Sequence, residues 1–271
     1  MSSTAISDLR ARRFLSFNRL LFALGEWRSR PLISVVIATF NRGQLLTERT
    51  IPSILQQTYG HFEIVVVGDG CTDDTGERLH RLNDSRIRWE NLPKRGVYPE
   101  DPFYRWLVAG TPPANRALDL ARGRWIAWCD DDDTWTDNHL IALLDHASQT
   151  DAELAYAAAM FQRSAEEWLR VGGVPPIPGH VPHSTVLYRS YLKAFRYDIE
   201  SWKEGMAGDA HRWQRMLKAG VRFSYLDRVL CHSPLRPGDV LRGQKAAEEA
   251  RRIWNDERER LNAERRTQNE E

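Results

Sequence analysis

The sequence predicts an α/β domain in which helices flank a mostly parallel central sheet. Short apolar runs rich in β-branched residues alternate along the chain with segments whose apolar residues have helical spacing. Runs of the first kind are typical of strands buried on both faces, and neighbouring parallel strands need a crossover segment between them. With 271 residues, 42% of them hydrophobic, the chain has enough apolar side chains to bury a large core, which excludes disorder for most of it.

The first elements alternate regularly between strand and helix. Strands are predicted at 33–38, 62–67 and 87–89, because each is a compact apolar run. Helices are predicted at 45–55 and 75–82, where the apolar residues recur every three or four positions. The resulting β-α-β-α-β order predicts a parallel arrangement of these strands.

The middle of the chain interrupts this alternation. The Pro-rich stretch at 92–113 is predicted to be a loop over a site, since long loops in compact domains usually serve function. A helix at 114–121, a strand at 125–129 and a helix at 138–149 then restore the pattern. Less regular elements follow, namely a strand at 154–161, a Gly- and Pro-rich loop at 172–179, a strand near 184–188 and a helix at 210–219.

Both ends of the chain are predicted to be helical extensions. Residues 1–30 hold six arginines against two acidic residues, and an N-cap is expected at Ser7–Asp8. In this helix an apolar stripe lies opposite Arg12 and Arg19, and it consists of Phe14, Phe17, Leu21 and Leu24. We expect the helix either to lie on an anionic membrane or to pack on its own domain or a second subunit. Residues 239–271 predict a charged helix, solvated or bound to a partner.

The overall charge and the cysteines narrow the range of possible functions. A formal net charge of +1 excludes a general attraction to nucleic acid, so we expect no nucleic-acid partner. The three cysteines lie far apart, which fits neither a disulfide framework nor a zinc ribbon. No apolar run is long enough to span a bilayer, and no signal peptide is evident. These observations predict a cytoplasmic protein, at most peripheral at the inner face of the membrane.

Four consecutive aspartates, residues 130–133, follow the predicted strand at 125–129. Adjacent like charges repel one another unless a cation or solvent compensates them. Alternate residues of an extended segment point the same way, so Asp130 and Asp132 can face one site. A few carboxylate ligands suit Mg²⁺ or Mn²⁺, which would complete its coordination with water and phosphate oxygens. The alternative is that these acids only cap the next helix, with Asp133 well placed to do so.

A second turn, at 68–73, also lies between a strand and a helix. It differs from a dinucleotide-binding turn, because Asp73 replaces the third glycine and the acidic Asp69 would repel a pyrophosphate. Asp69 is better suited to accept a hydrogen bond from a ring N–H, as in uracil or guanine. The alternative is an Asx turn in which Asp73 or Asp74 caps the following helix.

Over about residues 31–238, the order of these motifs resembles the family 2 glycosyltransferases, in particular bacterial members of the spore-coat polysaccharide type. The segments that carry the resemblance lie at 34–42, 56–58, 67–75, 115–133, 208–213 and 217–223. The resemblance implies the A-type glycosyltransferase fold. It also implies a nucleotide-binding half at 31–133 and an acceptor half at 134–238.

The resemblance also implies roles for individual residues. The nucleotide and donor would be bordered by Thr39, Phe40, Asn41, Arg42, Asp69 and Asn115. Asp130 or Asp131 would reach the ribose or the donor sugar, and Asp132 would hold a divalent cation, Mn²⁺ or Mg²⁺. Asp209 would be the catalytic base, and His183 and Trp202 would lie on the acceptor side.

Two departures from the family pattern concern the nucleotide. Pro113, Ala114 and Asn115 stand where many members have Ala-Arg-Asn, so the usual arginine is absent and Arg95, Arg105 or Arg116 are the candidates to replace it. Residues 68–71 retain only one of the paired aspartates that usually contact the base.

The expected activity is metal-dependent, inverting transfer of a sugar from a nucleoside-diphosphate sugar to an acceptor hydroxyl. A UDP-sugar is favoured as donor and a GDP-sugar is the alternative, with a saccharide or glycolipid acceptor in polysaccharide or glycoconjugate synthesis. Two other functions remain open from the sequence: a sugar nucleotidyltransferase, and an inactive carbohydrate-binding or scaffold relative. A homo-oligomer is also left open.

Overall fold

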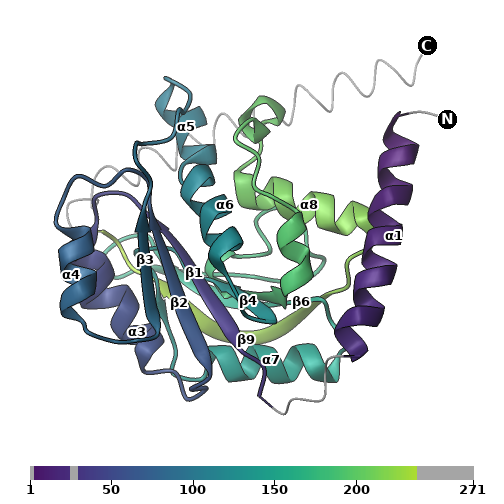
Figure 1. Ribbon diagram of the computed structural model, residues 1–271, viewed down its shortest axis with the longest axis horizontal. Helices are drawn as coiled ribbons and strands as arrows, with labels where there is room; N and C mark the ends of the chain where they lie inside the picture. Colours follow the sequence, from purple (N-terminus) through teal and green to yellow (C-terminus); the bar gives the residue numbers. More distant parts are fainter. Residues whose placement is uncertain (1–2, 25–29, 237–271) are drawn as a thin grey trace.

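The computed structural model describes residues 3–24 and 30–236, and for 3–9 and 24 it describes the backbone alone. The predicted helix at 239–271 lies outside the described residues. Within them, helices cover both faces of a central sheet, as predicted (Figure 1). The α/β fold class is therefore confirmed.

The described residues form a nine-stranded mixed sheet in the order β3-β2-β1-β4-β8-β6-β9-β5, with β7 paired to β6. The four strands β3, β2, β1 and β4 are parallel, as predicted, whereas β8 runs antiparallel between β4 and β6. The strands are β1 (Ile33–Thr39), β2 (Phe62–Gly68), β3 (Ile87–Asn91), β4 (Trp125–Trp128), β5 (Thr134–Trp135), β6 (Leu154–Gln162), β7 (Trp168–Val171), β8 (Val186–Arg189) and β9 (Phe223–Ser233).

The helices form two layers around this sheet (Figure 1). They are α1 (Ser3–Leu24), α2 (Gly43–Leu45), α3 (Ile51–Leu55), α4 (Thr75–Arg81), α5 (Pro102–Val108), α6 (Thr111–Leu120), α7 (His139–Gln149) and α8 (Gly208–Ala219). In β1, Val35 and Ile37 belong to the core with α3 and α7, whereas Val36 belongs to the core with α6 and α8. The strand is buried on both faces, which explains its continuous apolar run.

Several parts of the chain differ from the prediction, and among them the short strands β5 and β7 were not predicted. The stretch at 92–113 is not all loop, because it holds α5 and the first turn of α6. Asp101 caps α5 by accepting hydrogen bonds from the backbone N–H groups of Phe103 and Tyr104, and Pro102 follows it at the first helical position. Strand β9 was not predicted, since Asp227 and Arg228 interrupt its apolar pattern.

The N-terminal helix α1 packs on its own domain, mainly through residues outside the predicted apolar stripe. Of that stripe, Phe14 is partly buried against the core, whereas Phe17 and Leu21 are exposed. The helix begins at Ser3, so Ser7–Asp8 lies within it and is not its cap. Leu15 and Phe22 are buried against the domain. Arg19 also faces inward, where its Nε and Nη2 bond the carboxylate of Glu153 at 3.0 and 2.5 Å. The Glu153 side chain is fully buried, so this pair ties α1 to the start of β6.

Candidate functional site

A cavity of about 810 Å³ opens where β1, β2 and β4 end. Carboxyl ends of parallel strands meet at one edge of a sheet, which is where open α/β sheets bind ligands. Helices α6 and α8 contribute other parts of the wall through Thr111 and Asp209. Most of the predicted site residues line this cavity: Thr39, Phe40, Arg42, Asp69, Asp130, Asp131, Asp132, His183 and Asp209.

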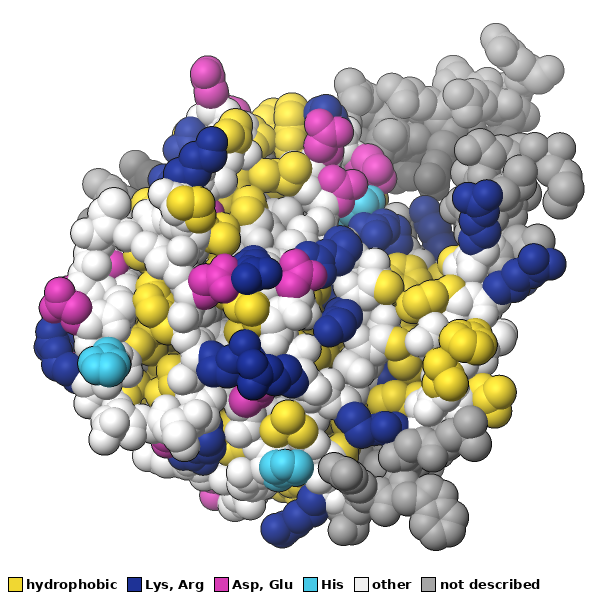
Figure 2. Space-filling view, viewed as in Figure 1, with side chains coloured by type: hydrophobic (Ala, Val, Ile, Leu, Met, Phe, Trp, Pro, Cys, Tyr) yellow, Lys and Arg dark blue, Asp and Glu magenta, His cyan; other side chains and the backbone are white. Residues whose placement is uncertain are grey.

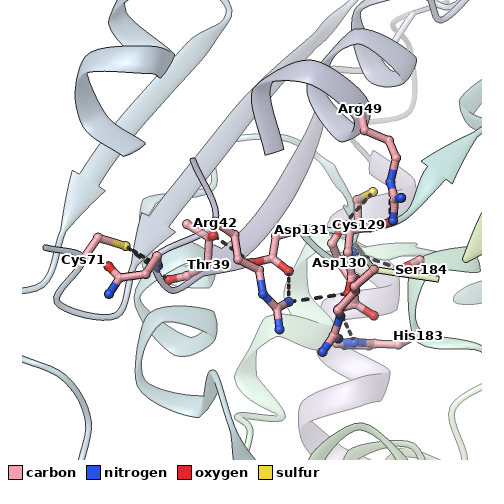
Figure 3. Close-up of polar contacts among 12 residues, drawn as sticks. Thr39, Arg42, Arg49, Cys71, Cys129, Asp130, Asp131, His183 and Ser184 are labelled. Atoms are coloured by element: carbon pink, nitrogen blue, oxygen red, sulfur yellow. Dashed lines mark hydrogen bonds and ion pairs between the residues drawn. The ribbon is translucent and has the colours of Figure 1, made fainter. Parts of the chain in front are cut away.

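The acid turn, residues 130–133, forms part of the cavity wall directly after β4. Asp131 accepts hydrogen bonds from the Thr39 hydroxyl at 2.7 Å and from Arg42 Nη1 at 2.6 Å (Figure 3). Arg42 Nη1 also lies 3.5 Å from Asp132 Oδ2, and Arg236 Nε bonds that same oxygen. The acid turn is therefore compensated in the described structure by two guanidinium groups.

Asp133 is not a helix cap, contrary to the alternative drawn from the sequence. The N-cap of α7 is Asn138, five residues further along the chain. Asp133 is buried, and its Oδ1 has no hydrogen-bond partner among the described residues. Burial, followed by the neighbouring carboxylates of Asp130 and Asp132, raises its pKa well above the ordinary value for aspartic acid.

The carboxylates of the acid turn fit a hard divalent cation. Asp132 has an oxygen that already binds positively charged groups, and Asp133 has an unpaired buried oxygen. No group of three or more His, Cys, Asp or Glu side chains in the described part of the chain has metal-binding geometry. A cation held at Asp132 would therefore take most of its ligands from water and substrate oxygens, as Mg²⁺ and Mn²⁺ commonly do.

A chain of hydrogen bonds runs from Arg212 through Tyr197 and His183 to Asp130. The guanidinium of Arg212 donates to the Tyr197 hydroxyl at 3.2 Å, and that hydroxyl lies 2.7 Å from His183 Nε2. If the hydroxyl donates to Nε2, then Nδ1 carries the ring proton and donates to Asp130 Oδ1 at 3.0 Å (Figure 3). Trp128 Nε1 donates to the same Asp130 oxygen at 2.7 Å and the Trp128 ring stacks on His183.

This network determines the charge of Asp130. Desolvation raises the pKa of its carboxyl, but the electrostatic attraction and hydrogen bond of His183 and the bonds from Trp128 and Ser184 outweigh it. Together they lower the pKa to about 2. Asp130 and Asp132 thus share the cavity as predicted for alternate residues, but Asp130 faces His183 and Asp132 faces the arginines.

Asp69 holds the loop that follows β3. Its two carboxylate oxygens accept hydrogen bonds from Gly96 N at 2.9 Å and from the Tyr98 hydroxyl at 2.6 Å. Burial and the adjacent Asp69 raise the pKa of Tyr98, so its hydroxyl stays protonated and donates. Gly70 has a φ of +69°, and a Cβ there would lie 2.4 Å from Arg95 N, which explains the need for glycine. The predicted contact of Asp69 with a base stays a prediction.

The Asx turn proposed for the same segment is present. Asp73 Oδ1 accepts hydrogen bonds from the N–H of Thr75 at 3.2 Å and from its hydroxyl at 2.5 Å, at the start of α4. The other carboxylate oxygen of Asp73 accepts a hydrogen bond from the N–H of Gly43 at 3.1 Å. Asp74 is the N-cap residue, although its side chain makes no capping bond.

Three predicted contact residues do not line the cavity, and each has a partner within the fold. Asn41 bonds the backbone and hydroxyl of Thr72 in the neighbouring loop. Asn115 pairs with the backbone N–H and C=O of Tyr197 at 3.0 and 2.9 Å. The Trp202 ring packs on Tyr104 with a centroid distance of 5.0 Å.

Of the three arginines considered as replacements for the missing one, only Arg95 lines the cavity. Its guanidinium lies 3.9 Å from the centroid of the Phe40 ring. Arg105 instead bonds backbone carbonyls near its own helix, and Arg116 pairs with Glu90 at 2.6 Å. The wall also holds residues that the sequence did not indicate, among them Tyr98, Trp106, Tyr197 and Arg236. Arg236 follows β9, a strand that was not predicted.

Asp209 lies in the first turn of α8 and lines the cavity. The N-cap of this helix is Ala207, so the alternative that Asp209 is the cap is wrong. Its carboxylate makes no hydrogen bond or ion pair within residues 3–24 and 30–236. The helix N-terminus favours a negative charge at this position. Asp209 is therefore a carboxylate available to a ligand in the cavity.

Comparison with known families gives one domain match. Residues 34–98 and 114–196 match the family described as Glycosyl transferase family 2. The matched residues include the end of β1, the turn after β2, the acid turn and His183. They stop before Asp209 and Arg236.

Curated relatives match less than half of the chain. The sequence is 34% identical to the putative colanic acid biosynthesis glycosyl transferase WcaA of Escherichia coli (strain K12), over 45% of this chain and 40% of that protein. It is 33% identical to the UDP-Glc:alpha-D-GlcNAc-diphosphoundecaprenol beta-1,3-glucosyltransferase WfaP of Escherichia coli, over 38% of this chain and 36% of that protein. The matches thus span about two fifths of the length of these relatives.

Solved structures share the fold at low sequence identity. The Staphylococcus aureus TarS 1–349 complex with UDP-GlcNAc has a TM-score of 0.55 and 19% identity, covering 76% of this chain and 59% of that one. The mannosyltransferase PcManGT from Pyrobaculum calidifontis, in complex with GDP-Man and Mn²⁺, has a TM-score of 0.58 and 15% identity, covering 86% and 68%. These similarities confirm the predicted A-type glycosyltransferase fold.

Proposed function

Because the chain belongs to glycosyl transferase family 2, we propose that it moves a sugar from a nucleoside-diphosphate sugar to an acceptor hydroxyl, with inversion at the sugar carbon. The observation that carries this proposal is the shared cavity, which is lined both by the acid turn and by Asp209. One group of carboxylates is paired with arginines and the other carboxylate is unpaired, so their environments suit different tasks.

The donor side is assigned to the ends of β1, β2 and β4. A divalent cation at Asp132, Mn²⁺ or Mg²⁺, would supply positive charge to the leaving diphosphate. Arg42 reaches both Asp131 and Asp132 and adds a fixed positive charge at the same place. Thr39 and Phe40 line the nucleotide region, and Asp131 and Asp130 are proposed to reach the ribose or the donor sugar.

The donor base is proposed to lie near Asp69. This carboxylate, and the Arg95 guanidinium stacked on Phe40, lie together in the cavity wall. A carboxylate can accept the ring N–H of uracil or guanine, so we favour a UDP-sugar and keep a GDP-sugar as the alternative. Asn41 would act by holding the adjacent loop, and Asn115 by fixing Tyr197.

On the acceptor side, Asp209 is proposed to remove the proton of the attacking hydroxyl. A base on the face opposite the leaving group gives direct displacement with inversion. His183, held between Asp130 and Tyr197, lines the same cavity and is proposed to contact the acceptor. Trp202 packs on Tyr104 outside the cavity lining, and we propose that it supports the acceptor entrance. The division into a nucleotide half (31–133) and an acceptor half (134–238) follows from these assignments.

The acceptor is proposed to be a saccharide or a glycolipid in polysaccharide or glycoconjugate synthesis. The names of two relatives support this class, because one refers to colanic acid biosynthesis and the other to a diphosphoundecaprenol-linked sugar. A lipid-linked acceptor would place the reaction close to a membrane. Within the described residues, no helix has the length and hydropathy that crossing a bilayer requires.

The outer face of α1 has the composition of a membrane-surface contact. Phe17, Leu20 and Leu21 are 62%, 60% and 49% exposed, and Arg10 and Arg13 are exposed on the same face. Figure 2 shows hydrophobic and basic side chains together on the surface along α1, at the right of the view. The sequence has no acidic residue between positions 9 and 25. We propose that this face contacts an anionic membrane.

Substituting Phe17, Leu20 and Leu21 together by serine is expected to lower binding to anionic lipid vesicles by at least ~10-fold, because apolar burial and charge attraction act together there. Removing 1–28 is a poorer test, since it would uncover the core residues against which Leu15 and Phe22 pack and would leave buried Glu153 without Arg19. Vesicle sedimentation measures the effect, with Val174→Ser/Ile177→Ser as the control at another exposed apolar site. Equal binding by both variants would contradict the proposal, and a change of oligomer mass alone would assign the face to a second copy.

The proposed activity is tested by a thermal-shift screen of UDP-, GDP- and dTDP-sugars with and without Mn²⁺. A ligand at 100 times its Kd stabilises the folded state by about 2.7 kcal/mol, which corresponds to about 5–10 °C in Tm. We expect this shift for one class of donor and only with the cation. No shift with any donor would contradict the proposal, and release of pyrophosphate from a nucleoside triphosphate would indicate a nucleotidyltransferase instead.

A further inference from the structure

The Asp132 carboxylate, assigned above to a cation, is paired with Arg236. The Asp132 side chain is 10% exposed, and one oxygen, Oδ2, faces both Arg236 Nε and Arg42 Nη1. Arg42 makes its shorter contact, 2.6 Å, with Asp131 and lies 3.5 Å from Asp132. Arg236 is therefore the closer positive charge to the oxygen that a divalent cation would need.

Arg49 holds the segment that carries Arg236 against the acid turn. Its Nε and Nη2 donate to the backbone carbonyl of Asp132 at 3.1 and 2.5 Å. The same guanidinium donates to the carbonyls of Pro234 and Leu235 at 3.2 and 3.4 Å. Figure 3 shows Arg49 reaching down to this turn from the helical segment after β1. The backbone before Arg236 is thus fixed at the site, whatever its side chain binds.

The position of Arg49 has a local cause. It lies in a single π-helical turn, Leu46–Thr50, between α2 and α3. Such turns insert a residue into a helix and change the direction of nearby side chains, and they are frequent at functional sites. On the other side, the N–H of Leu235 donates to Gln162 Oε1 of β6 at 3.1 Å. Two elements therefore fasten the segment at 234–235.

We propose that Arg236 neutralises Asp132 while the site is empty and pairs with the donor diphosphate once a divalent cation has taken that carboxylate. A cation and a guanidinium cannot occupy the same lone pairs of Oδ2. The Arg236 side chain is 43% exposed and lines the cavity, so it can turn toward a phosphate while its backbone stays fixed. A guanidinium suits phosphate oxygens because it can donate two parallel hydrogen bonds.

This inference rests on the proposed function and supplies a replacement for the arginine that many family members have before α6 and that this chain lacks. The other arginines of the wall are less suited. Arg42 remains in its ion pair with Asp131 when a cation binds Asp132, and Arg95 stacks on Phe40 beside Asp69. Arg236 alone among these three has its closest carboxylate partner at the proposed cation ligand.

The test compares Arg236→Ala and Arg236→Lys with the full-length wild type, and uses Arg228→Ala, an exposed arginine of β9, as the matched control. Calorimetry measures Mn²⁺ affinity without nucleotide, and then UDP, UMP, GDP and GMP affinity at saturating Mn²⁺. For Arg236→Ala we expect Mn²⁺ to bind ~3- to 10-fold more tightly, because a competing positive charge is gone. We expect the affinity for the nucleoside diphosphate to fall by ~10- to 100-fold and the affinity for the monophosphate by less than ~2-fold. The Arg236→Lys variant should show an intermediate loss of affinity for the nucleoside diphosphate.

The outcomes separate this inference from the proposed function. A wild type that binds no nucleotide with either Mn²⁺ or Mg²⁺ refutes the proposed function. A wild type that binds UDP or GDP, together with an Arg236→Ala variant of unchanged diphosphate affinity, refutes only the role of Arg236. Equal losses of affinity for the diphosphate and the monophosphate would also overturn the role of Arg236, and so would weaker Mn²⁺ binding in the alanine variant. Both results indicate a general effect on the site.

Discussion

Replacing Asp132 by alanine is expected to abolish cation-dependent binding of the nucleoside diphosphate, with a loss of at least ~10²-fold in affinity. In our proposal this carboxylate is the chain's principal ligand for the cation, and the cation contributes several kcal/mol to holding and neutralising the diphosphate. Titration calorimetry with UDP or GDP in the presence of Mn²⁺ measures the effect. The monophosphate should depend far less on Asp132.

The structure indicates that this variant will fold. Within the described part of the chain, the side chain of Asp132 bonds only the ends of two arginines. Arg236 is 43% exposed, so water can solvate its guanidinium when the carboxylate is removed. An unchanged Tm would check this point. Asp137→Ala is the control, because Asp137 is an exposed acid of the same segment. Wild-type affinity in the Asp132 variant would refute its assignment as the cation ligand.

The second large effect is expected at Asp209. Substitution by asparagine should lower the transfer rate by ~10²–10⁴-fold, because an amide cannot accept the proton of the acceptor hydroxyl. Donor affinity should be unchanged, since the cavity residues assigned to the donor lie at the ends of β1, β2 and β4 and in the segments that follow them. The quantities to measure are single-turnover transfer and donor affinity in the same preparation.

The fold of the Asp209→Asn variant should be preserved. Ala207 is the N-cap of α8, and the Asp209 carboxylate has no polar partner in the described residues, so no structural bond is lost. A neighbouring substitution, Gln214→Ala on the same helix, serves as a control for helix stability. Full activity of Asp209→Asn would move the search for the base to His183, whose ring also lines the cavity.

The buried half of the sheet could be predicted from the sequence because its signal is local. The runs at 33–38, 62–67 and 125–129 are apolar at nearly every position, and strands buried on both faces need this composition. Their order along the chain predicted parallel pairing, which places their carboxyl ends at one edge. The convergence of Thr39, Asp69 and the acid turn on one cavity follows from this arrangement.

The tertiary structure alone decided the partners of the charged side chains. Asp132 and Arg236 are more than a hundred residues apart in sequence, and the strand that brings Arg236 to the site, β9, has its apolar pattern broken by Asp227 and Arg228. Predicting a strand from sequence uses only the apolar pattern of neighbouring residues. This pattern did not predict β9, because the pairing of β9 with β6 and β5 determines its conformation.

The same limit applies to the face on which α1 packs. The sequence by itself determined that this segment is an amphipathic, basic helix, because helical spacing and charge are properties of the segment. It could not determine which side packs inward, since Arg19 is attracted inward by Glu153, a carboxylate buried far away in the chain. Local patterns thus determined the elements and the sheet edge that forms the cavity. Contacts between distant residues decided which carboxylates are paired, which one is left for a ligand, and which surface of α1 remains exposed.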